Sequence, residues 1–378
     1  MGVAINLALP LYYLREGLEP AMIGIITSGS SMAYLISPFA FRNVHKKIGM
    51  KKSFLISVCG FLLIMVVFQI SLNPWLVYFL MIAEGILLGL YWPILMTTIS
   101  VVSNSPHLRE NDTLKDKLMN HYSLAWNIGG IVSFIIGTIL LYIVDDINIM
   151  FGLALIYAIL LFVCALLFEE PKSEVNNNKE PLIVNEKSQL DLKRENIRFP
   201  IYLPIIFTSF FSFFLGAVSF AYPVKSEALG FALFTNYLFS FFRMGMQTLS
   251  ISQNMKLDIK LFKRLIPISL IILLAFFIFM GFNVNIIFFG VLLSVFGFFV
   301  AFLYSFSFKL FIFRNMSENT SKYSIYFETM IGVGFFLAPI ITGFIASFSV
   351  NFSFFFMALV ATALLVFFLA LKHKISTD

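Results

Sequence analysis

Three ionisable side chains fall inside long apolar segments of this 378-residue sequence: Glu84, Arg243 and Glu328. A charge in an apolar medium is costly, so such residues usually face protein or water and mark the path of an ion or a substrate. Glu84, which is followed by Gly85 and Gly89, is interpreted as a proton-titrating or substrate-binding carboxyl group. The alternative is a neutral carboxyl group held in a close contact between helices.

Arg243 and Glu328 are candidates for a gate or a coupling pair. Each is expected about 10 Å from the cytoplasmic end of its segment, at a rise of about 1.5 Å per residue. Equal depth permits an ion pair, and a low-dielectric site demands pairing because an isolated buried charge is costly. Two interpretations stay open: a pair whose state changes during transport, and a static salt bridge.

Polar side chains also recur at helical spacing within apolar segments. One stripe, with steps of four, three and four residues, comprises Asn236, Ser240, Arg243 and Gln247. Two others comprise Gly24, Thr27, Ser31, Tyr34 and Pro38, and Asn120, Ser123, Asn127, Gly130 and Gly137. A polar stripe within a bilayer must face water or another helix. Asn127, Asn236 and Gln247 are therefore candidate substrate-binding groups, with close helix packing as the alternative.

The composition indicates the medium that surrounds these residues. Hydrophobic residues make up 60% of the sequence and charged residues 12%, and the mean hydropathy is +0.92. Because a soluble domain carries about 25% charged residues, this composition excludes a soluble enzyme, a disordered protein and a disulfide-stapled secreted domain. It predicts a helical integral membrane protein. Full spans are expected at 20–41, 53–71, 75–98, 122–144, 149–168, 200–222, 230–250, 265–282, 286–308, 323–346 and 351–371, with a partial span at 1–14.

The distribution of the 26 Lys and Arg residues sets the orientation. If the polar segment 169–199 is cytoplasmic and the spans alternate, nearly all of these cations lie on the cytoplasmic side, as membrane proteins require. The cations are then membrane anchors, so nucleic acid is not expected as a partner. Arg15 and Lys225 fall outside, and Tyr12, Tyr13 and Tyr222 are assigned to interfacial anchoring. The C-terminus is cytoplasmic, and the plasma membrane is the expected location.

The spans form two similar sets. Residues 1–168 are predicted to be one helical bundle, 169–199 a cytoplasmic linker, 200–372 a second bundle and 373–378 a cytoplasmic tail. The second set repeats the first, because Pro10 and Gly17 match Pro223 and Gly230 at one offset. The fold class is therefore an all-α membrane protein with two six-helix bundles. Eleven spans are full, and the first helix is predicted to lack its start; a true eleven-span protein is the alternative.

This layout, with a basic loop after the second span, resembles the major facilitator superfamily. In this loop, Lys47, Gly49, Lys51 and Lys52 fit that family's signature. Lys46 stands at its acidic position, and Arg42 stands where the signature has a glycine four residues earlier. The resemblance implies alternating access between the two bundles, with this loop taking part in the conformational switch. The acid of that family's charge relay is absent from this loop, and the sequence matches no subfamily.

The function expected from these features is secondary transport of a small organic molecule, with proton-coupled efflux as the leading mode. The alternatives are a sugar or metabolite facilitator or uptake carrier, and a non-transporting sensor or inactive paralogue. No metal or other cofactor is expected, since none of the four His has a ligand at metal-binding spacing on a helix. No phosphate-binding Gly-x-x-x-x-Gly-Lys-Ser/Thr motif occurs, so ATP is not an expected partner.

Overall fold

The structure, a computed structural model, describes residues 2–41, 44–103, 112–170, 197–254, 257–317 and 322–377. The N-terminal half contains α1 (Gly2–Arg15), α2 (Pro20–Tyr34), α3 (Ser37–Ala40), α4 (Val44–Ile48), α5 (Met50–Ile70), α6 (Pro74–Ser103), α8 (Asp112–Val144) and α9 (Ile149–Leu167). The C-terminal half contains α10 (Tyr202–Ala228), α11 (Leu233–Asn254), α12 (Ile259–Phe282), α13 (Ile286–Ser317), α14 (Lys322–Phe348) and α15 (Val350–Leu371).

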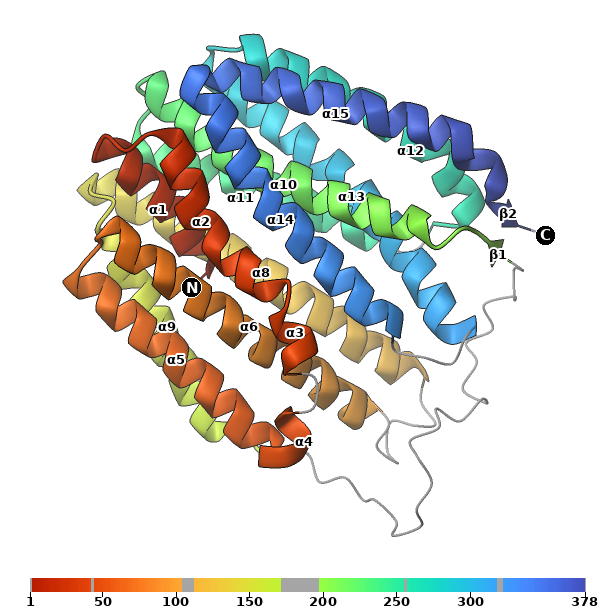
Figure 1. Ribbon diagram of the computed structural model, residues 1–378, viewed down its shortest axis with the longest axis horizontal. Helices are drawn as coiled ribbons and strands as arrows, with labels where there is room; N and C mark the ends of the chain where they lie inside the picture. Colours follow the sequence, from red (N-terminus) through yellow and green to blue (C-terminus); the bar gives the residue numbers. More distant parts are fainter. Residues whose placement is uncertain are drawn as a thin grey trace.

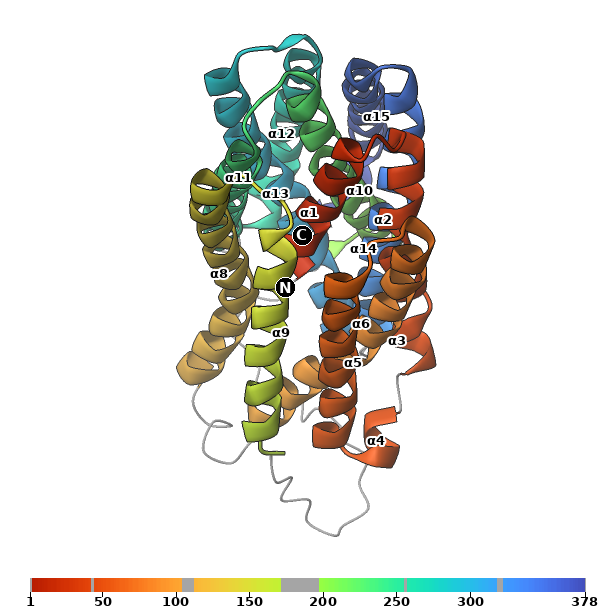
Figure 2. The same cartoon turned by 90° about the vertical axis from the view of Figure 1, so that its left-hand side faces the viewer.

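The helices of each half gather into their own bundle, and the two bundles lie side by side (Figures 1 and 2). Because the long helices alternate in direction, the loops after α1, α5, α8, α10, α12 and α14 share one end of the molecule. We call this the loop end. The other end, which carries Gly49, Glu170 and Asp258, is called the linker end.

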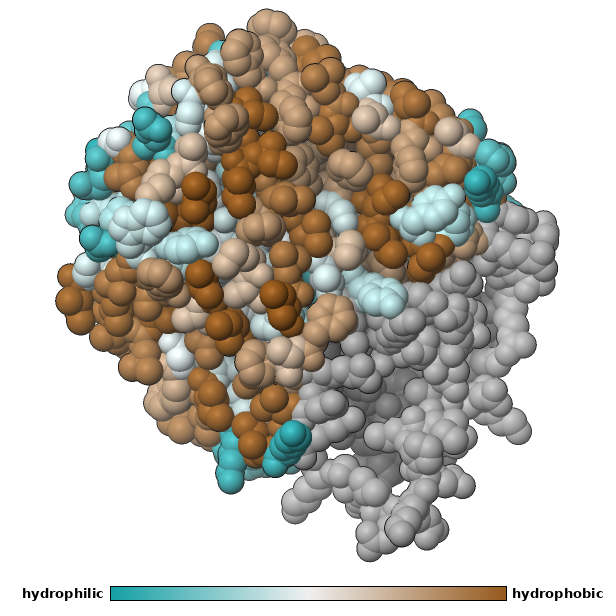
Figure 3. Space-filling view, in the orientation of Figure 1, coloured by the Kyte–Doolittle hydropathy of each residue, from teal (hydrophilic) through white to brown (hydrophobic). Residues whose placement is uncertain are grey.

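The helices suit a bilayer. Within the described ranges, ten are long and apolar enough to cross a membrane by length and composition. Neither α1, with 14 residues, nor α11, which carries the polar stripe, is among them. The predicted count of eleven full spans and one partial span is therefore not confirmed by this criterion. One face of the molecule is mostly apolar, with hydrophilic residues near its margins (Figure 3), as lipid contact requires.

Matching helix ends confirm the internal repeat locally. Gly17 and Gly230 end α1 and α10, and both have positive φ, of 79° and 69°. This left-handed conformation favours glycine because it has no Cβ atom. The next pair is Asn73 and Asn285, whose side-chain oxygens accept hydrogen bonds from the first backbone N–H groups of α6 and α13. Both are N-caps.

The main contacts between the halves pair α2 with α14, α8 with α11, and α1 with α10, and a smaller contact pairs α3 with α14. The α2–α14 contact is close because Gly24 lies against the backbone of Pro339 and Gly343. A Cβ atom on Gly24 would overlap the Pro339 carbonyl oxygen. At the loop end, an ion pair of 3.1 Å joins Arg15 on α1 to Glu227 on α10.

The C-terminal half has an aromatic core. Its fully buried rings include Phe207, Phe214, Phe262, Phe276, Phe277, Phe289, Phe296 and Phe306. Several of these rings pack edge-on or stacked; the Phe276 and Phe296 centroids lie 4.8 Å apart. Such geometry adds to the stabilisation from area burial alone. Much of the phenylalanine in this half therefore packs helix on helix and does not contact lipid.

The predicted cytoplasmic tail is attached to the end of the predicted linker. Ile197–Arg198 (β1) pairs antiparallel with Ser376–Thr377 (β2), after a 3-10 turn at Lys372–Lys374. The Lys263 ammonium group of α12 also donates to the Ile375 carbonyl. These bonds hold residues 197–198 and 375–377 against the C-terminal half.

Candidate functional site

Glu84 is buried in the N-terminal half, where α6 crosses α2 and α3. Its side chain is only 4% exposed and forms a hydrogen bond with the Ser30 hydroxyl of α2. Gly85 and Gly89 allow this approach, since a Cβ atom on either would overlap Ser30 or Ser37. The Ser37 hydroxyl donates to the Gly85 carbonyl at 3.0 Å. Glu84 therefore occupies a close, polar helix contact and is not exposed to lipid.

Glu328 contacts the opposite half of the molecule. The Tyr34 hydroxyl of α2 donates to Glu328 Oε2 of α14 at 3.0 Å. Next to this bond, Leu35 packs tightly against Gly332. Among the hydrogen bonds of the described residues, this one joins a candidate carboxylate of one bundle to a hydroxyl group of the other.

The two candidate carboxylates are linked through α2. Ser30, which binds Glu84, and Tyr34, which binds Glu328, are four residues apart and so lie about one helical turn apart. Glu84 belongs to the N-terminal half and Glu328 to the C-terminal half. A movement of α2 relative to α14 would therefore change the surroundings of both groups.

Arg243 and Glu328 do not form an ion pair in this structure. Within the described residues, the ion pair Arg15–Glu227 is the one that meets a 4.0 Å limit. The depth argument fails because α11 continues to Asn254, eleven residues beyond Arg243, whereas Glu328 lies six residues from the start of α14 at Lys322. At about 1.5 Å per residue, Arg243 lies deeper than Glu328.

Arg243 instead faces Tyr222 of α10. Arg243 is 8% exposed, and its guanidinium group interacts electrostatically with Tyr222. The Tyr222 hydroxyl donates to the Asn236 carbonyl at 2.9 Å and also forms a hydrogen bond with Ser240. Residues of the predicted α11 stripe therefore surround one tyrosine.

The other candidate groups are also buried. Asn236 and Gln247 lie on α11 and Asn127 on α8, and each is at most 2% exposed. The α8 and α11 helices pack against each other, with Gly137 next to Tyr237. The structure thus places all three amides in the interior, on helices that join the two halves.

Two residues that the sequence assigns to the membrane surface are buried instead. Tyr222 is expected to anchor the interface, yet it is 1% exposed and its hydroxyl donates to the Asn236 carbonyl of α11. Lys225 is expected outside, yet it is 3% exposed. Its ammonium group donates to the Met280 and Gly281 carbonyls at the end of α12 and lies 5.6 Å from the Phe354 ring centroid. The spacing of Tyr222 and Lys225 in the sequence does not distinguish them from residues at the membrane surface, so their burial could not be predicted.

The predicted switch loop contains a turn at a glycine and is bonded to an acid from another part of the chain. Gly49 has φ of +90°, and the following Met50 N–H donates to Glu170 Oε1 at 2.9 Å. Lys47 and Lys52 are exposed and Lys51 is half-buried, while the Lys46 side chain lies outside the described residues. Glu170 follows α9, so the end of the N-terminal bundle is bonded to the loop that precedes α5.

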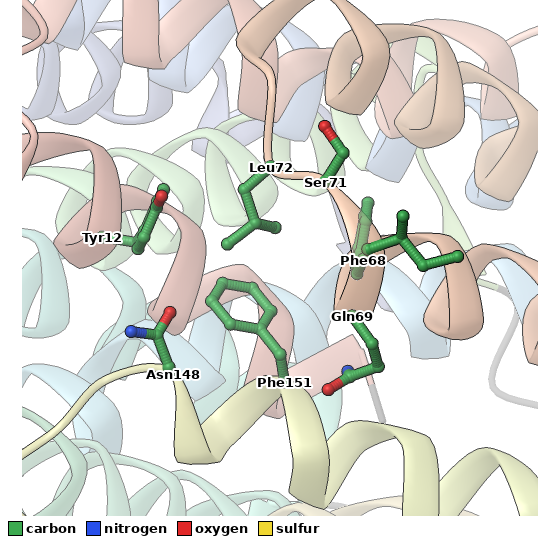
Figure 4. Close-up of a pocket in the computed structure, with 8 residues that line it drawn as sticks. Tyr12, Phe68, Gln69, Ser71, Leu72, Asn148 and Phe151 are labelled. Atoms are coloured by element: carbon green, nitrogen blue, oxygen red, sulfur yellow. The ribbon is translucent and has the colours of Figure 1, made fainter.

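A pocket of about 330 Å³ opens at the loop end, between the ends of α1, α5 and α9 (Figure 4). It is lined by Tyr12, Phe68, Gln69, Ile70, Ser71, Leu72, Asn148 and Phe151. None of the candidate charged residues lines it. We therefore base the functional site on the buried polar groups and not on this pocket.

The fold is similar to that of solved transporters. The structures include a mutant of the nucleoside transporter NupG (TM-score 0.71, 15% identity, covering 98% of this chain and 96% of that one). A structure of a proton dependent oligopeptide transporter gives a TM-score of 0.68 at 14% identity, with 98% and 94% covered. The inward open xylose transporter XylE of E. coli gives 0.67 at 12% identity, with 98% and 95% covered.

The sequence comparisons agree with the fold. No curated protein matches the sequence at a significant level. The family model of the Major Facilitator Superfamily matches residues 1–322, which is most of the chain. Together with the mostly helical, two-bundle structure, this match indicates a membrane transporter. This chain belongs to the major facilitator superfamily.

Proposed function

We propose that this protein is a secondary active transporter that moves a small organic molecule across the membrane by alternating access. Proton-coupled efflux is the leading mode. The observation that carries this proposal is the Tyr34–Glu328 hydrogen bond, because it joins the two halves through a half-buried ionisable group within a helix that is long and apolar enough to span a membrane. Groups of this kind serve proton relays in membrane proteins.

Glu328 is assigned the coupling role. When its carboxylate is ionised, it accepts a charge-assisted hydrogen bond from Tyr34, which is stronger than a neutral one. When it binds a proton, that bond weakens and the contact between α2 and α14 loosens. The proton enters from one side of the membrane and leaves to the other after the bundles have moved. Glu84, bonded to Ser30 on the same helix, provides a second carboxyl group of this type.

The loop of Lys46, Lys47, Gly49, Lys51 and Lys52 is proposed to take part in the switch between conformations. Its bond to Glu170 supports this role, since it links α5 to the end of α9. The protein is proposed to lie in the plasma membrane with the linker and C-terminus in the cytoplasm. The excess of cations at the linker end supports that orientation.

Transport into membrane vesicles of known orientation, with and without a proton gradient, tests the proposal. A panel of labelled organic solutes should include one whose accumulation depends on the gradient. In Glu328→Gln, the same solute should still exchange across the membrane, but the gradient should no longer drive its accumulation. Accumulation that persists in Glu328→Gln would contradict the coupling role.

A facilitator or uptake carrier for a sugar or metabolite is the second candidate. It is favoured by Asn236, whose side-chain amide is buried and has no hydrogen-bond partner within the described part of the chain. Such amides bind hydroxyl groups. The same vesicle assay separates the candidates, because a facilitator equilibrates its solute without a proton gradient. If no solute in the panel moves, a non-transporting membrane protein is favoured.

A further inference from the structure

Arg243 is a buried cation that forms no ion pair with any residue that the structure describes. It is more than nine-tenths buried near the middle of α11, and its Nε atom has no hydrogen-bond partner among the residues that the structure describes. Among the same residues, Arg15 and Glu227 form an ion pair, but Arg243 has no acidic partner. An uncompensated buried charge is strongly destabilising, so its presence in a transporter points to a charge that arrives with a ligand.

The other buried cation of this half shows the contrast. Lys225 donates to two carbonyl groups at the end of α12, where the helix dipole is negative, and so its charge is compensated inside the protein. Arg243 lacks such acceptors in the described contacts. The Tyr222 hydroxyl is held by the Asn236 carbonyl and by Ser240, and it interacts electrostatically with the Arg243 guanidinium group.

A second unsatisfied group lies on the same helix face. Both polar atoms of the Asn236 side chain are buried without a partner in the described structure. Asn236 is seven residues from Arg243, which corresponds to about 10 Å along the helix axis. A buried polar group without a hydrogen bond costs free energy. Two such groups on one face indicate a ligand that offers both a negative charge and a hydrogen-bonding group.

We propose that Arg243 binds a single negatively charged group, such as a carboxylate, of the transported molecule. Tyr222 orients the guanidinium group, and Asn236 binds a neutral polar group of the same molecule. The planar guanidinium group can donate two parallel hydrogen bonds to a carboxylate, which a lysine cannot do. The proposal rests on the proposed transport function and makes the substrate an organic monoanion.

The first test needs no ligand. Thermal unfolding of the full chain in detergent micelles compares Arg243→Met with Lys225→Met, which serves as the matched buried-cation control. Arg243→Met should raise the melting temperature of the empty protein by about 2 °C or more, because it removes an uncompensated charge. Lys225→Met should lower it. If Arg243→Met lowers it as well, Arg243 has a partner within the protein and the proposal is wrong.

The second test measures binding to the wild-type chain. Benzoate and hexanoate are compared with their neutral counterparts benzamide and hexanamide. At least one carboxylate should bind, at least about 30-fold more tightly to wild type than to Arg243→Gln, and Arg243→Lys should recover part of that loss. Equal binding of acid and amide, equal binding to Arg243→Gln, or no carboxylate binding would each overturn the proposal.

Uptake of the same four compounds into proteoliposomes separates the two proposals. Carboxylate binding that depends on Arg243 but gives no uptake would contradict transport and leave the anion site intact. Uptake of the neutral amides that is unchanged in Arg243→Gln would contradict the anion site and leave the transport function intact.

Discussion

Single residues show how this protein accommodates charge inside an apolar bundle. Glu84 and Glu328 each bind a hydroxyl group of α2, and Lys225 binds two backbone carbonyls. Each contact replaces hydrogen bonds that water would otherwise provide, as the low dielectric of the interior requires. Arg243 is the exception, so it is the residue whose role is best tested by substitution.

Glu328 should be energetically coupled to Tyr34. In a double-mutant cycle of unfolding free energy, Tyr34→Phe and Glu328→Gln should show a coupling of about 1–3 kcal/mol, since a hydrogen bond to a charged group is broken. The control cycle combines Arg243→Gln with Glu328→Gln. It should be additive within about 0.5 kcal/mol, as expected for residues that share no contact. Stronger coupling in the control cycle would show that Arg243 and Glu328 form an ion pair after all.

Lys225 should contribute to the stability of the C-terminal half. Lys225→Met leaves the Met280 and Gly281 carbonyls without their donor, so the unfolding free energy should fall by about 2–3 kcal/mol. Chemical denaturation of the purified chain measures this change. The partly exposed Lys51→Met provides the control and should be nearly neutral.

At the scale of helices, small residues determine how closely α2 approaches its neighbours. Gly24 lies against Pro339, and Gly85 and Gly89 lie against Ser30 and Ser37. In lipid, helices associate through van der Waals packing and interhelical hydrogen bonds, and small residues permit both. The α2 helix is therefore held between α6 of its own half and α14 of the other half.

Gly24→Ala should loosen the contact between α2 and α14. The added methyl group overlaps the Pro339 carbonyl oxygen, and such overpacking costs about 1–3 kcal/mol. The melting temperature should therefore fall. Gly152→Ala on α9 is the matched control, because a Cβ atom there meets no atom within 4 Å. Equal melting temperatures for the two variants would show that the close contact does not form.

For the whole molecule, the contacts between the halves extend from the loop end toward the linker end. The Arg15–Glu227 ion pair joins α1 to α10 at the loop end, and Tyr34–Glu328 joins α2 to α14 nearer the linker end. Alternating access requires contacts at one end to break while those at the other end form. The Arg15–Glu227 pair should therefore separate in one step of the cycle.

A reversible cross-link at the loop end tests this requirement. In a variant with Arg15→Cys and Glu227→Cys, and with Cys59 and Cys164 replaced by Ser, a short thiol cross-linker should abolish transport, and reduction should restore it. Neutralising the pair in Arg15→Gln should change stability little, by about 0–1 kcal/mol, since both side chains are partly exposed. Full transport by the cross-linked protein would exclude opening at this end.

The sequence alone determined that this protein is a helical membrane protein and that Glu84, Arg243, Asn127, Asn236 and Gln247 lie within its helices. Apolar runs of about 20 residues follow from bilayer thickness, and charges are rare within them because they are costly. The stripe on α11 was also visible, since it depends only on the 3.6-residue helical period. Gly17 and Gly230 could also be matched from the sequence, because the ends of helices depend on local backbone conformation.

Tertiary structure decided which groups meet. The predicted partner of Glu328 was Arg243, but its observed partner is Tyr34, because the rotation and the crossing of α2 and α14 determine side-chain neighbours. The depth of Arg243 depended on where α11 ends, and the burial of Tyr222 and Lys225 depended on packing by α11, α12 and α15. Spacing along one helix contains no information on the distance between helices, so these contacts required the folded chain.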